Sequence, residues 1–282
     1  MLNIKLMIID TFLYFNEKEL AELRIKYLND YVDAFVIIEA DVTHQGKKKE
    51  WNFESLLNDN LKNFSQKIRY HKLKIDMTEA NSEFGWIHEE IKGGRSWKIE
   101  NMQRNYIKEA CKDFAAKDII IISDVDEIPS KEKIKFIKSC DFQFISPVAF
   151  EQFLFHLDCK YLNLEKWIGS VATTKELIDK YEPQELRNNR YKISQFVRSG
   201  WSFSSFGGLN KVREKFEAFA HEEYNNEKFK NKEHLLKCME NGEDLFKRKT
   251  KKQKVNRDFF PKDLLQIMEE NPKFYFGNEI KK

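Results

Sequence analysis

The sequence predicts an α/β protein in which helices flank a central mixed, mostly parallel sheet. Apolar runs rich in β-branched residues alternate with segments of helical spacing, and residues 119–122 are four consecutive isoleucines. An apolar strand without alternation is typical of a sheet that is covered on both faces. The 282 residues allow one large domain or two small ones, and 10 Gly and 5 Pro are too few for a linker-rich architecture.

The elements of the first half follow from the spacing of apolar residues. Leu20, Leu23 and Leu28 recur at roughly helical spacing after an apolar segment, which predicts a strand and then a helix. Two further runs, 33–39 and 67–75, read as strands, and an amphipathic stretch at 100–115 leads into the isoleucine strand. We therefore expect strands at 4–9, 33–39, 67–75 and 119–122, and helices at 18–28 and 100–115.

The second half is less regular. A Phe-rich region over 142–157 predicts two more strands, whereas the polar stretch 173–191 favours a loop or a helix with a loop. Apolar spacing predicts the remaining helices at 131–139, 211–220 and 261–270.

Composition excludes several classes of protein. Hydrophobic residues make up 41% and aromatic residues 14%, which rules out wholesale disorder, and a formal net charge of +3 does not indicate a nucleic-acid partner. No apolar run approaches the roughly 20 residues of a membrane span, and the first ten residues do not resemble a signal peptide. Four scattered cysteines without a CxxC pair argue against a zinc ribbon or a disulfide scaffold. We expect a cytoplasmic protein with reduced cysteines.

Two aspartates follow the isoleucine strand in the segment Ser-Asp-Val-Asp-Glu-Ile-Pro. Residues two apart on an extended chain point to the same side, so Asp124 and Asp126 present two carboxylates at the carboxyl end of a buried strand. Open α/β sheets bind ligands at that edge. Hard anionic oxygens suit Mg²⁺ or Mn²⁺, which in turn bridges diphosphate oxygens. The pair therefore predicts a metal-diphosphate site.

Three other interpretations remain open for this segment. A DxD sequence occurs by chance in many proteins, and its acids can be simply solvated in a loop. A strand ending in Asp-x-Asp also describes haloacid-dehalogenase-like phosphatases, although their motif usually lies near the N-terminus and not at residue 124. A non-catalytic nucleotide-sugar-binding module is the third alternative.

Blocks spread over most of the chain resemble glycosyltransferase family 17. The resemblance begins with Asp-Thr-Phe-Leu-Tyr-Phe-Asn-Glu at residues 10–17, includes the DxD segment, and ends with Asn-Pro at 271–272. The other matching blocks are Leu20 to Arg24, Val32 to Val36, Glu39, Thr43, Gly46, Lys47, Gly200 to Ser204, Phe219 to Glu222 and Phe260-Pro-Lys. One departure is Ser202, which stands where the family has His.

The resemblance implies a GT-A-like nucleotide-sugar-binding fold and an inverting, metal-dependent glycosyltransferase. Its donor would be a UDP-sugar, and we expect N-acetylglucosamine from UDP-GlcNAc. The acceptor would be a saccharide or lipid-linked saccharide, in surface glycan synthesis. The cofactor would be Mn²⁺ or Mg²⁺. Because the matching blocks extend from residue 10 to about residue 272, a single domain over 1–282 is favoured. We expect a nucleotide-binding half over 1–130, an acceptor half over 131–245, and a basic segment with a terminal helix over 246–282.

Site roles are carried over from the same resemblance. Asp126 would bind the metal directly, Asp124 would touch the metal, its water, the ribose or the donor sugar, and His221 would be a further metal ligand. The other expected donor contacts are Asp10, Asn16, Glu17, Glu39, Thr43, Arg104, Asn105 and Trp201. The base that deprotonates the acceptor is expected among Glu151, Glu222 and Glu223. The alternatives are a structural histidine at 221, a surface ion pair at Arg104 and an aromatic core segment around Trp201.

A basic run from Lys247 to Lys254 precedes the terminal helix. Such a run can contact an anionic membrane surface or a lipid diphosphate, which would place the protein at the inner face of the membrane. A solvated loop is the more common fate of such a sequence.

Overall fold

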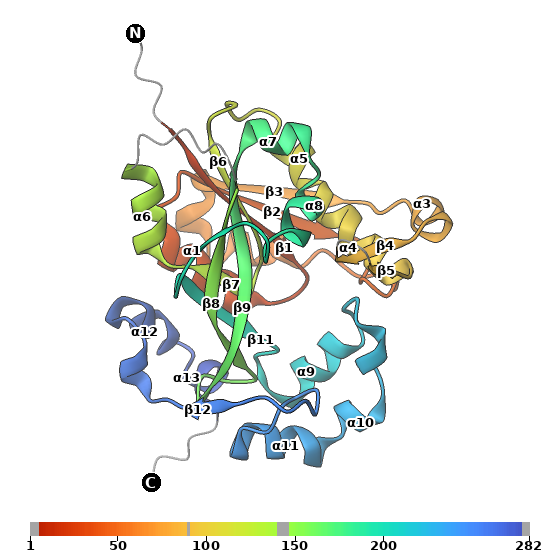
Figure 1. The fold of residues 1–282 in the computed structure, drawn as a ribbon, viewed down its shortest axis with the longest axis vertical. Coiled ribbons are helices and arrows are strands. Elements are labelled where there is room, and N and C mark those ends of the chain that lie inside the picture. Colours follow the sequence, from red (N-terminus) through yellow and green to blue (C-terminus); the bar gives the residue numbers. More distant parts are fainter. Residues whose placement is uncertain (1–5, 89–90, 140–146, 278–282) are drawn as a thin grey trace.

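The structure is a computed structural model that describes residues 6–88, 91–139 and 147–277. Within these ranges one ten-stranded sheet runs through the molecule in the order β3-β2-β1-β6-β9-β8-β11-β7, with β10 paired to β8 and β12 to β9. Helices pack against the sheet on both sides (Figure 1). The predicted fold class, an α/β fold with a mostly parallel central sheet of GT-A-like form, is confirmed.

The first half of the chain supplies the parallel part of the sheet. It contains β1 (Ile8–Tyr14), β2 (Ala34–Ala40), β3 (Ile68–Leu73) and β6 (Ile119–Asp124). Alternate side chains of β6 enter different cores: Ile119 and Ile121 pack on the side of helix α1 (Lys18–Leu28), and Ile120 and Ile122 on the side of α5 (Ile107–Ala110). Burial on both faces explains why this strand is apolar throughout.

The second half completes the sheet with longer, mixed strands. The 14-residue strand β9 (Tyr161–Thr174) lies antiparallel between β6 and β8 (Val148–His156), and β11 (Gly200–Ser204) runs parallel to β8. Short strands extend this half at its margins, namely β7 (Glu127–Pro129), β10 (Ser194–Phe196) and β12 (Lys252–Lys254).

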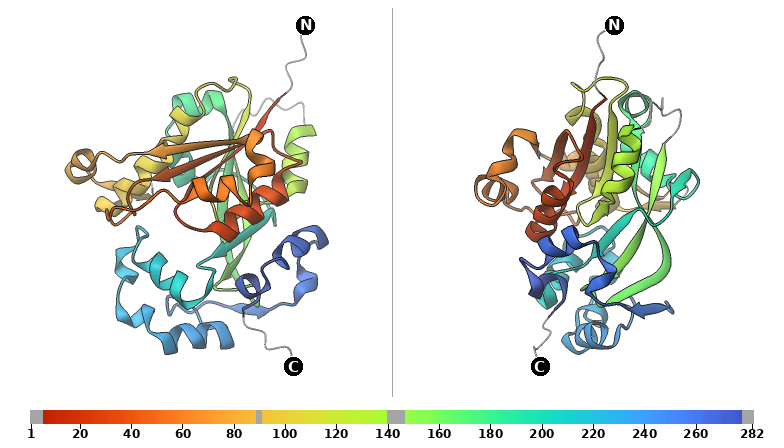
Figure 2. Two further views of the ribbon diagram at one scale, coloured as in Figure 1. Left: turned by 180° about the vertical axis from the view of Figure 1, so that it is seen from behind. Right: turned by 90° about the vertical axis from the view of Figure 1, so that its left-hand side faces the viewer.

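The remaining elements are short. Figure 2 shows α9 to α11 grouped at the end of the molecule opposite the N-terminus. The full set of remaining helices and strands is α2 (Phe53–Asn58), η1 (Lys62–Lys67), α3 (Met77–Ser82), β4 (Gly85–His88), β5 (Ile91–Gly93), α4 (Arg95–Asn105), α6 (Lys131–Ser139), α7 (Lys175–Lys180), α8 (Pro183–Asn188), α9 (Gly208–Phe216), η2 (Glu222–Tyr224), α10 (Glu227–Lys230), α11 (Lys232–Asn241), η3 (Arg257–Phe259), α12 (Lys262–Met268) and α13 (Pro272–Tyr275), within the described ranges.

The end of the chain returns to its beginning. Leu264 and Met268 of α12 and Tyr275 of α13 are buried in the same core as Leu20 and Leu23 of α1. The Tyr275 hydroxyl donates a hydrogen bond to the Glu19 carbonyl oxygen over 2.7 Å. The C-terminal segment is therefore part of the core that supports the first strands.

Several predicted elements differ from the structure. The helices at 18–28 and 131–139 have the predicted bounds, but the first described strand covers Ile8–Tyr14 and not 4–9, whose first residues lie outside the described part. The helix expected at 100–115 begins earlier and is divided into α4 and α5. Of the two strands expected at 142–157, β8 is present and residues 142–146 lie outside the described ranges. Strand β9 was not predicted.

Gly200 is required where β11 meets β7. Its φ is +148°, and an added Cβ would overlap the Ile128 carbonyl oxygen and lie 2.9 Å from the Pro129 Cα. We expect Gly200→Ala to lower the free energy of unfolding by at least about 2 kcal/mol, measured by urea denaturation. The matched control is Gly94→Ala, where, apart from the adjacent residues of the chain, no described residue has an atom within 4 Å of the new Cβ and a change below about 1 kcal/mol is expected. Equal effects of the two substitutions would contradict the packing argument.

Candidate functional site

A cavity of about 840 Å³ opens at the carboxyl ends of the parallel strands. Tyr14, Ala40 and Asp124, the last residues of β1, β2 and β6, all line it. Its other walls come from α4, α8, α9 and the cavity-facing side of β8, β9 and β11. The DxD segment thus lies at the sheet edge where α/β folds bind ligands, as the sequence predicts.

Asp124 is held by two arginines. Its Oδ1 accepts from Arg104 Nη2 of α4 over 2.6 Å, and its Oδ2 accepts from Arg187 Nη2 of α8 over 2.8 Å. The same Arg187 nitrogen also donates to Glu127 Oε1 over 2.7 Å. Burial alone would raise the pKa of Asp124, but Arg187 and Arg104 hold it well below its usual range. Asp124 is therefore an ionised carboxylate whose two oxygens are already engaged.

Asp126 has a different environment. Its side chain is buried, its Oδ2 accepts from Lys215 Nζ over 3.0 Å, and its Oδ1 accepts no hydrogen bond from the described residues. Burial raises the pKa of Asp126 more than Lys215 lowers it. Burial would lower the pKa of Lys215, but Asp126 and Glu17 together raise it. A partly paired, desolvated carboxylate of this kind favours the approach of a further cation.

The turn that carries both aspartates is fixed from beneath by Arg24. This side chain is fully buried, and its Nε and Nη2 donate to the two carboxylate oxygens of Asp10 over 2.7 and 2.6 Å. Its Nη1 donates to the carbonyl oxygens of Asp124 and Glu127 over 3.0 and 2.6 Å. A planar guanidinium matches this arrangement, which a lysine could not reproduce. Arg24 thereby joins α1, β1 and the DxD turn.

Six of the residues that the sequence predicts for the site line the cavity: Glu17, Thr43, Arg104, Asp124, Asp126 and His221. The described cavity lining does not include Asp10, Asn16, Glu39, Asn105, Trp201, Glu151, Glu222 and Glu223. Several of these side chains have structural partners instead. Glu39 is fully buried and accepts from Lys49 and Tyr70, and Trp201 packs in the core against Tyr27 with ring centroids 5.8 Å apart.

His221 lines the cavity, but its described hydrogen bond is to Glu223 and not to Asp124 or Asp126. Its Nδ1 is 2.6 Å from Glu223 Oε1, and its ring packs edge-on against Trp97 at 4.6 Å between centroids. Among the described residues, no three His, Cys, Asp or Glu side chains are grouped closely enough to hold a metal ion by themselves. The metal role of His221 stays a prediction.

The sequence analysis did not single out several cavity residues, among them Arg187, Lys215, His156 and Trp167. Arg187 lies in the polar stretch expected to be a loop or a helix with a loop, 63 residues from its partner Asp124. Lys215 lies in a predicted helix, and Asp126 is 89 residues away. In the sequence, Arg187 and Lys215 are recognisable only as charged residues within or next to an amphipathic segment. That pattern does not indicate which residue each of them pairs with.

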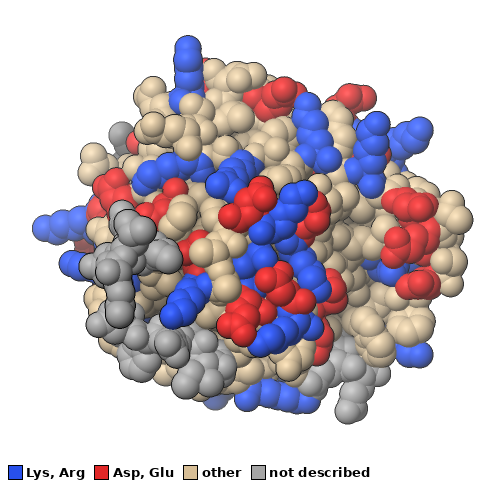
Figure 3. Space-filling view, turned by 90° about the horizontal axis from the view of Figure 1, so that it is seen from above, with Lys and Arg blue, Asp and Glu red and all other residues tan. Residues whose placement is uncertain are grey.

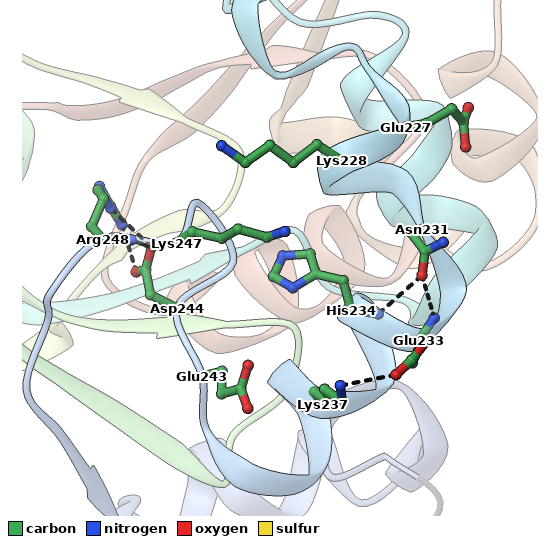
Figure 4. A pocket seen from close by; sticks show the side chains of 10 residues that line it. All are labelled: Glu227, Lys228, Asn231, Glu233, His234, Lys237, Glu243, Asp244, Lys247 and Arg248. Carbon is green, nitrogen blue, oxygen red and sulfur yellow. Dashed lines mark hydrogen bonds and ion pairs between the residues drawn. The ribbon is translucent and has the colours of Figure 1, made fainter.

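The basic run folds back onto the sheet. Residues Lys252–Lys254 form β12 against β9, and Arg248 pairs with Asp244 over 2.9 Å. A second pocket of about 640 Å³ borders this run, and both cationic and anionic side chains line it, with Lys237 paired to Glu233 (Figure 4). Charges of both signs are also interspersed on the face shown in Figure 3. Within the described ranges, no helix is long and apolar enough to traverse a bilayer.

The sequence of the chain is similar to a known protein family and to several mammalian proteins. Residues 2–274 match the family model of glycosyltransferase family 17. The β-1,4-mannosyl-glycoprotein 4-β-N-acetylglucosaminyltransferases of Homo sapiens and Rattus norvegicus are each 26% identical over 141 residues, which is 48% of this chain and 24% of theirs. The match thus spans about a quarter of the length of these relatives.

Among solved structures, a Bacillus anthracis protein described as a "Putative Glucose-1-Phosphate Thymidylyltransferase" is similar at a TM-score of 0.38 and 11% identity, over 70% of this chain and 88% of that one. Because this score is low, the fold assignment rests on the strand order and register described above. The family match covers nearly the whole chain, including both aspartates and every cavity residue named here. The chain belongs to glycosyltransferase family 17.

Proposed function

We propose that the protein is an inverting, metal-dependent glycosyltransferase that transfers N-acetylglucosamine from UDP-GlcNAc to a saccharide acceptor. The observation that carries this proposal is the aspartate pair at the carboxyl end of β6, where Asp124 binds Arg104 and Arg187 and Asp126 binds Lys215. The pair lines a cavity large enough for a nucleotide sugar. Family membership supports a sugar donor and a saccharide acceptor. The names of the mammalian relatives support N-acetylglucosamine as the donor sugar.

The residues present fit a divalent cation at Asp126. No donor from the described residues binds its Oδ1, and Mg²⁺ or Mn²⁺ is commonly bound by one or two carboxylates together with substrate phosphates and waters. Asp124 fits a different role, because both of its oxygens bind guanidinium groups. A metal bound at Asp126 would supply positive charge to the diphosphate leaving group.

The chain's own groups account for the rest of the proposed reaction. Lys215 can turn from Asp126 toward the diphosphate, where its ammonium group stabilises the charge that develops as UDP leaves. Arg104 and Arg187 keep Asp124 ionised and fix the turn. Glu151, Glu222 and Glu223 lie outside the described cavity lining. Of the lining carboxylates, Glu17 and Glu165 form no ion pair with a lysine or arginine within the described ranges, so we add them as candidates for accepting the acceptor proton.

Metal removal tests this proposal. After dialysis against EDTA, we expect release of UDP from UDP-GlcNAc to fall by at least about 100-fold, and added MnCl2 or MgCl2 to restore it. The same preparations are given an aryl phosphate, which a haloacid-dehalogenase-like phosphatase would hydrolyse. Full UDP release in the chelated protein would contradict metal dependence. Turnover of the aryl phosphate without any release of UDP would contradict the glycosyltransferase assignment.

A further inference from the structure

The cavity has two chemically different ends. Near the end of β6 its walls carry the charged groups Arg104, Arg187 and Lys215 together with the two aspartates. On β8, β9 and β11 most of the lining side chains are neutral, and Glu165 and Lys166 of β9 are the charged ones among the described lining residues of these strands. This second wall includes His156, Asn163, Trp167, Ser202 and Ser204.

Strand register places this neutral wall on one face of the sheet. Leu154 pairs with Asn163 on β9 and with Ser202 on β11, and His156 pairs with Ser204. Directly paired residues of neighbouring strands point to the same side, as do residues two apart within a strand. The backbone N–H of Phe203 on β11 donates to the Asp126 carbonyl oxygen over 2.9 Å. The wall therefore begins beside the DxD turn and continues away from it.

His156 is the most unusual member of this wall. It is 9% exposed, it lines the cavity, and neither ring nitrogen has a hydrogen-bond partner within the part of the chain that the structure describes. Its ring instead packs edge-on against Phe246, with centroids 5.8 Å apart. A buried polar group without a partner is costly, so its presence beside a binding cavity indicates a ligand that supplies the missing bond.

Burial, with Lys252 and Arg248 adding to it and Asp244 opposing it, lowers the pKa of His156 to about 3. The imidazole is therefore neutral at physiological pH, with one nitrogen that donates and one that accepts. The Trp167 Nε1 on β9 is also buried and has no hydrogen-bond partner among the described residues. Neutral groups of this kind complement hydroxyl groups, whereas a diphosphate would require the cations at the other end.

We propose that the cavity-facing side of β8 and β9, centred on His156 and Trp167, binds the neutral saccharide acceptor. The His156 ring exchanges hydrogen bonds with a sugar hydroxyl, and the Trp167 ring offers an apolar surface to the C–H face of the sugar. This inference rests on the proposed function, because it assigns the charged end of the cavity to the nucleotide sugar. It identifies the chemical class of the second ligand and the residues that recognise it.

Binding measurements on the full chain test this inference. With MnCl2 and UDP present, a panel of chitobiose, β-1,4-mannobiose, cellobiose and lactose is titrated by saturation-transfer difference NMR, and UDP affinity is measured separately by calorimetry. We expect at least one disaccharide to bind. His156→Phe keeps the ring packing but removes both nitrogens, and should weaken that binding about tenfold with UDP affinity unchanged within twofold. Trp167→Leu should weaken the same saccharide similarly, and it serves if His156→Phe does not fold.

The matched control is Leu164→Ala on the same strand, because Leu164 is exposed and lies between Asn163 and Glu165 in the strand alternation. We expect no change in either affinity. Unaltered saccharide binding in both His156→Phe and Trp167→Leu, or binding of none of the four disaccharides by a wild-type protein that binds UDP, would overturn this inference alone. Failure of the wild type to bind UDP would instead contradict the proposed function.

Discussion

Asp126→Asn is expected to lower the metal-dependent release of UDP from UDP-GlcNAc by about 10²- to 10³-fold. The amide keeps the size of the side chain but removes the negative charge that faces the open Oδ1 side of the site. Without that charge the site loses the carboxylate proposed for the metal, and Lys215 loses its ion-pair partner. The measurement is the rate of UDP release as a function of MnCl2 concentration, for which the half-saturating concentration should rise in the variant.

Asp179→Asn is the control for this substitution, because Asp179 pairs with Lys175 within helix α7 and does not line the cavity. Its UDP release and its manganese dependence should match those of the wild type. An Asp126→Asn protein with an unchanged rate and an unchanged response to manganese would remove Asp126 from the proposed metal site.

Arg24→Met should lower the free energy of unfolding by about 3–5 kcal/mol. The substitution leaves the fully buried Asp10 carboxylate without its two guanidinium donors and frees the carbonyl oxygens of Asp124 and Glu127. Because Arg24 fixes the DxD turn, UDP release should fall as well, even under conditions where the variant is folded. Urea denaturation followed by circular dichroism measures the first effect, and the UDP assay the second.

Two further proteins make this result interpretable. The double substitution Arg24→Met with Asp10→Leu removes both charges and should recover part of the lost stability without recovering activity, since the turn remains unanchored. Lys180→Met breaks the exposed pair with Glu176 and should change stability by less than about 1 kcal/mol. If Arg24→Met is as stable as Lys180→Met, the anchoring role is wrong.

The sequence predicts the position of the aspartate pair well because that prediction is local. Four isoleucines followed by Asp-x-Asp define a buried strand and its end, and both carboxylates line the cavity. Their different environments depend on long-range contacts. Arg187 and Lys215 reach the pair from helices 63 and 89 residues away, and spacing along the chain does not encode which helix packs on which edge.

A shift of strand bounds accounts for the different position of Asp10. The sequence favours a strand that ends before Asp10, which would bring this residue to the sheet edge. The structure extends β1 to Tyr14, so Asp10 lies in mid-strand and points into the core toward Arg24. Glu39 shares that side of the sheet with Phe35 and Ile37, where it binds Lys49 and Tyr70.

The packing of α12 and α13 near α1 determines when the core can form during synthesis. Tyr275 contacts Glu19 across 256 positions, and β1 pairs with β6, more than one hundred residues later. Contacts between such distant segments form only after the intervening chain has been synthesised, and they slow folding. The core beneath the aspartate turn is therefore completed only after residue 275 has been synthesised, and until then its apolar strands remain open to aggregation.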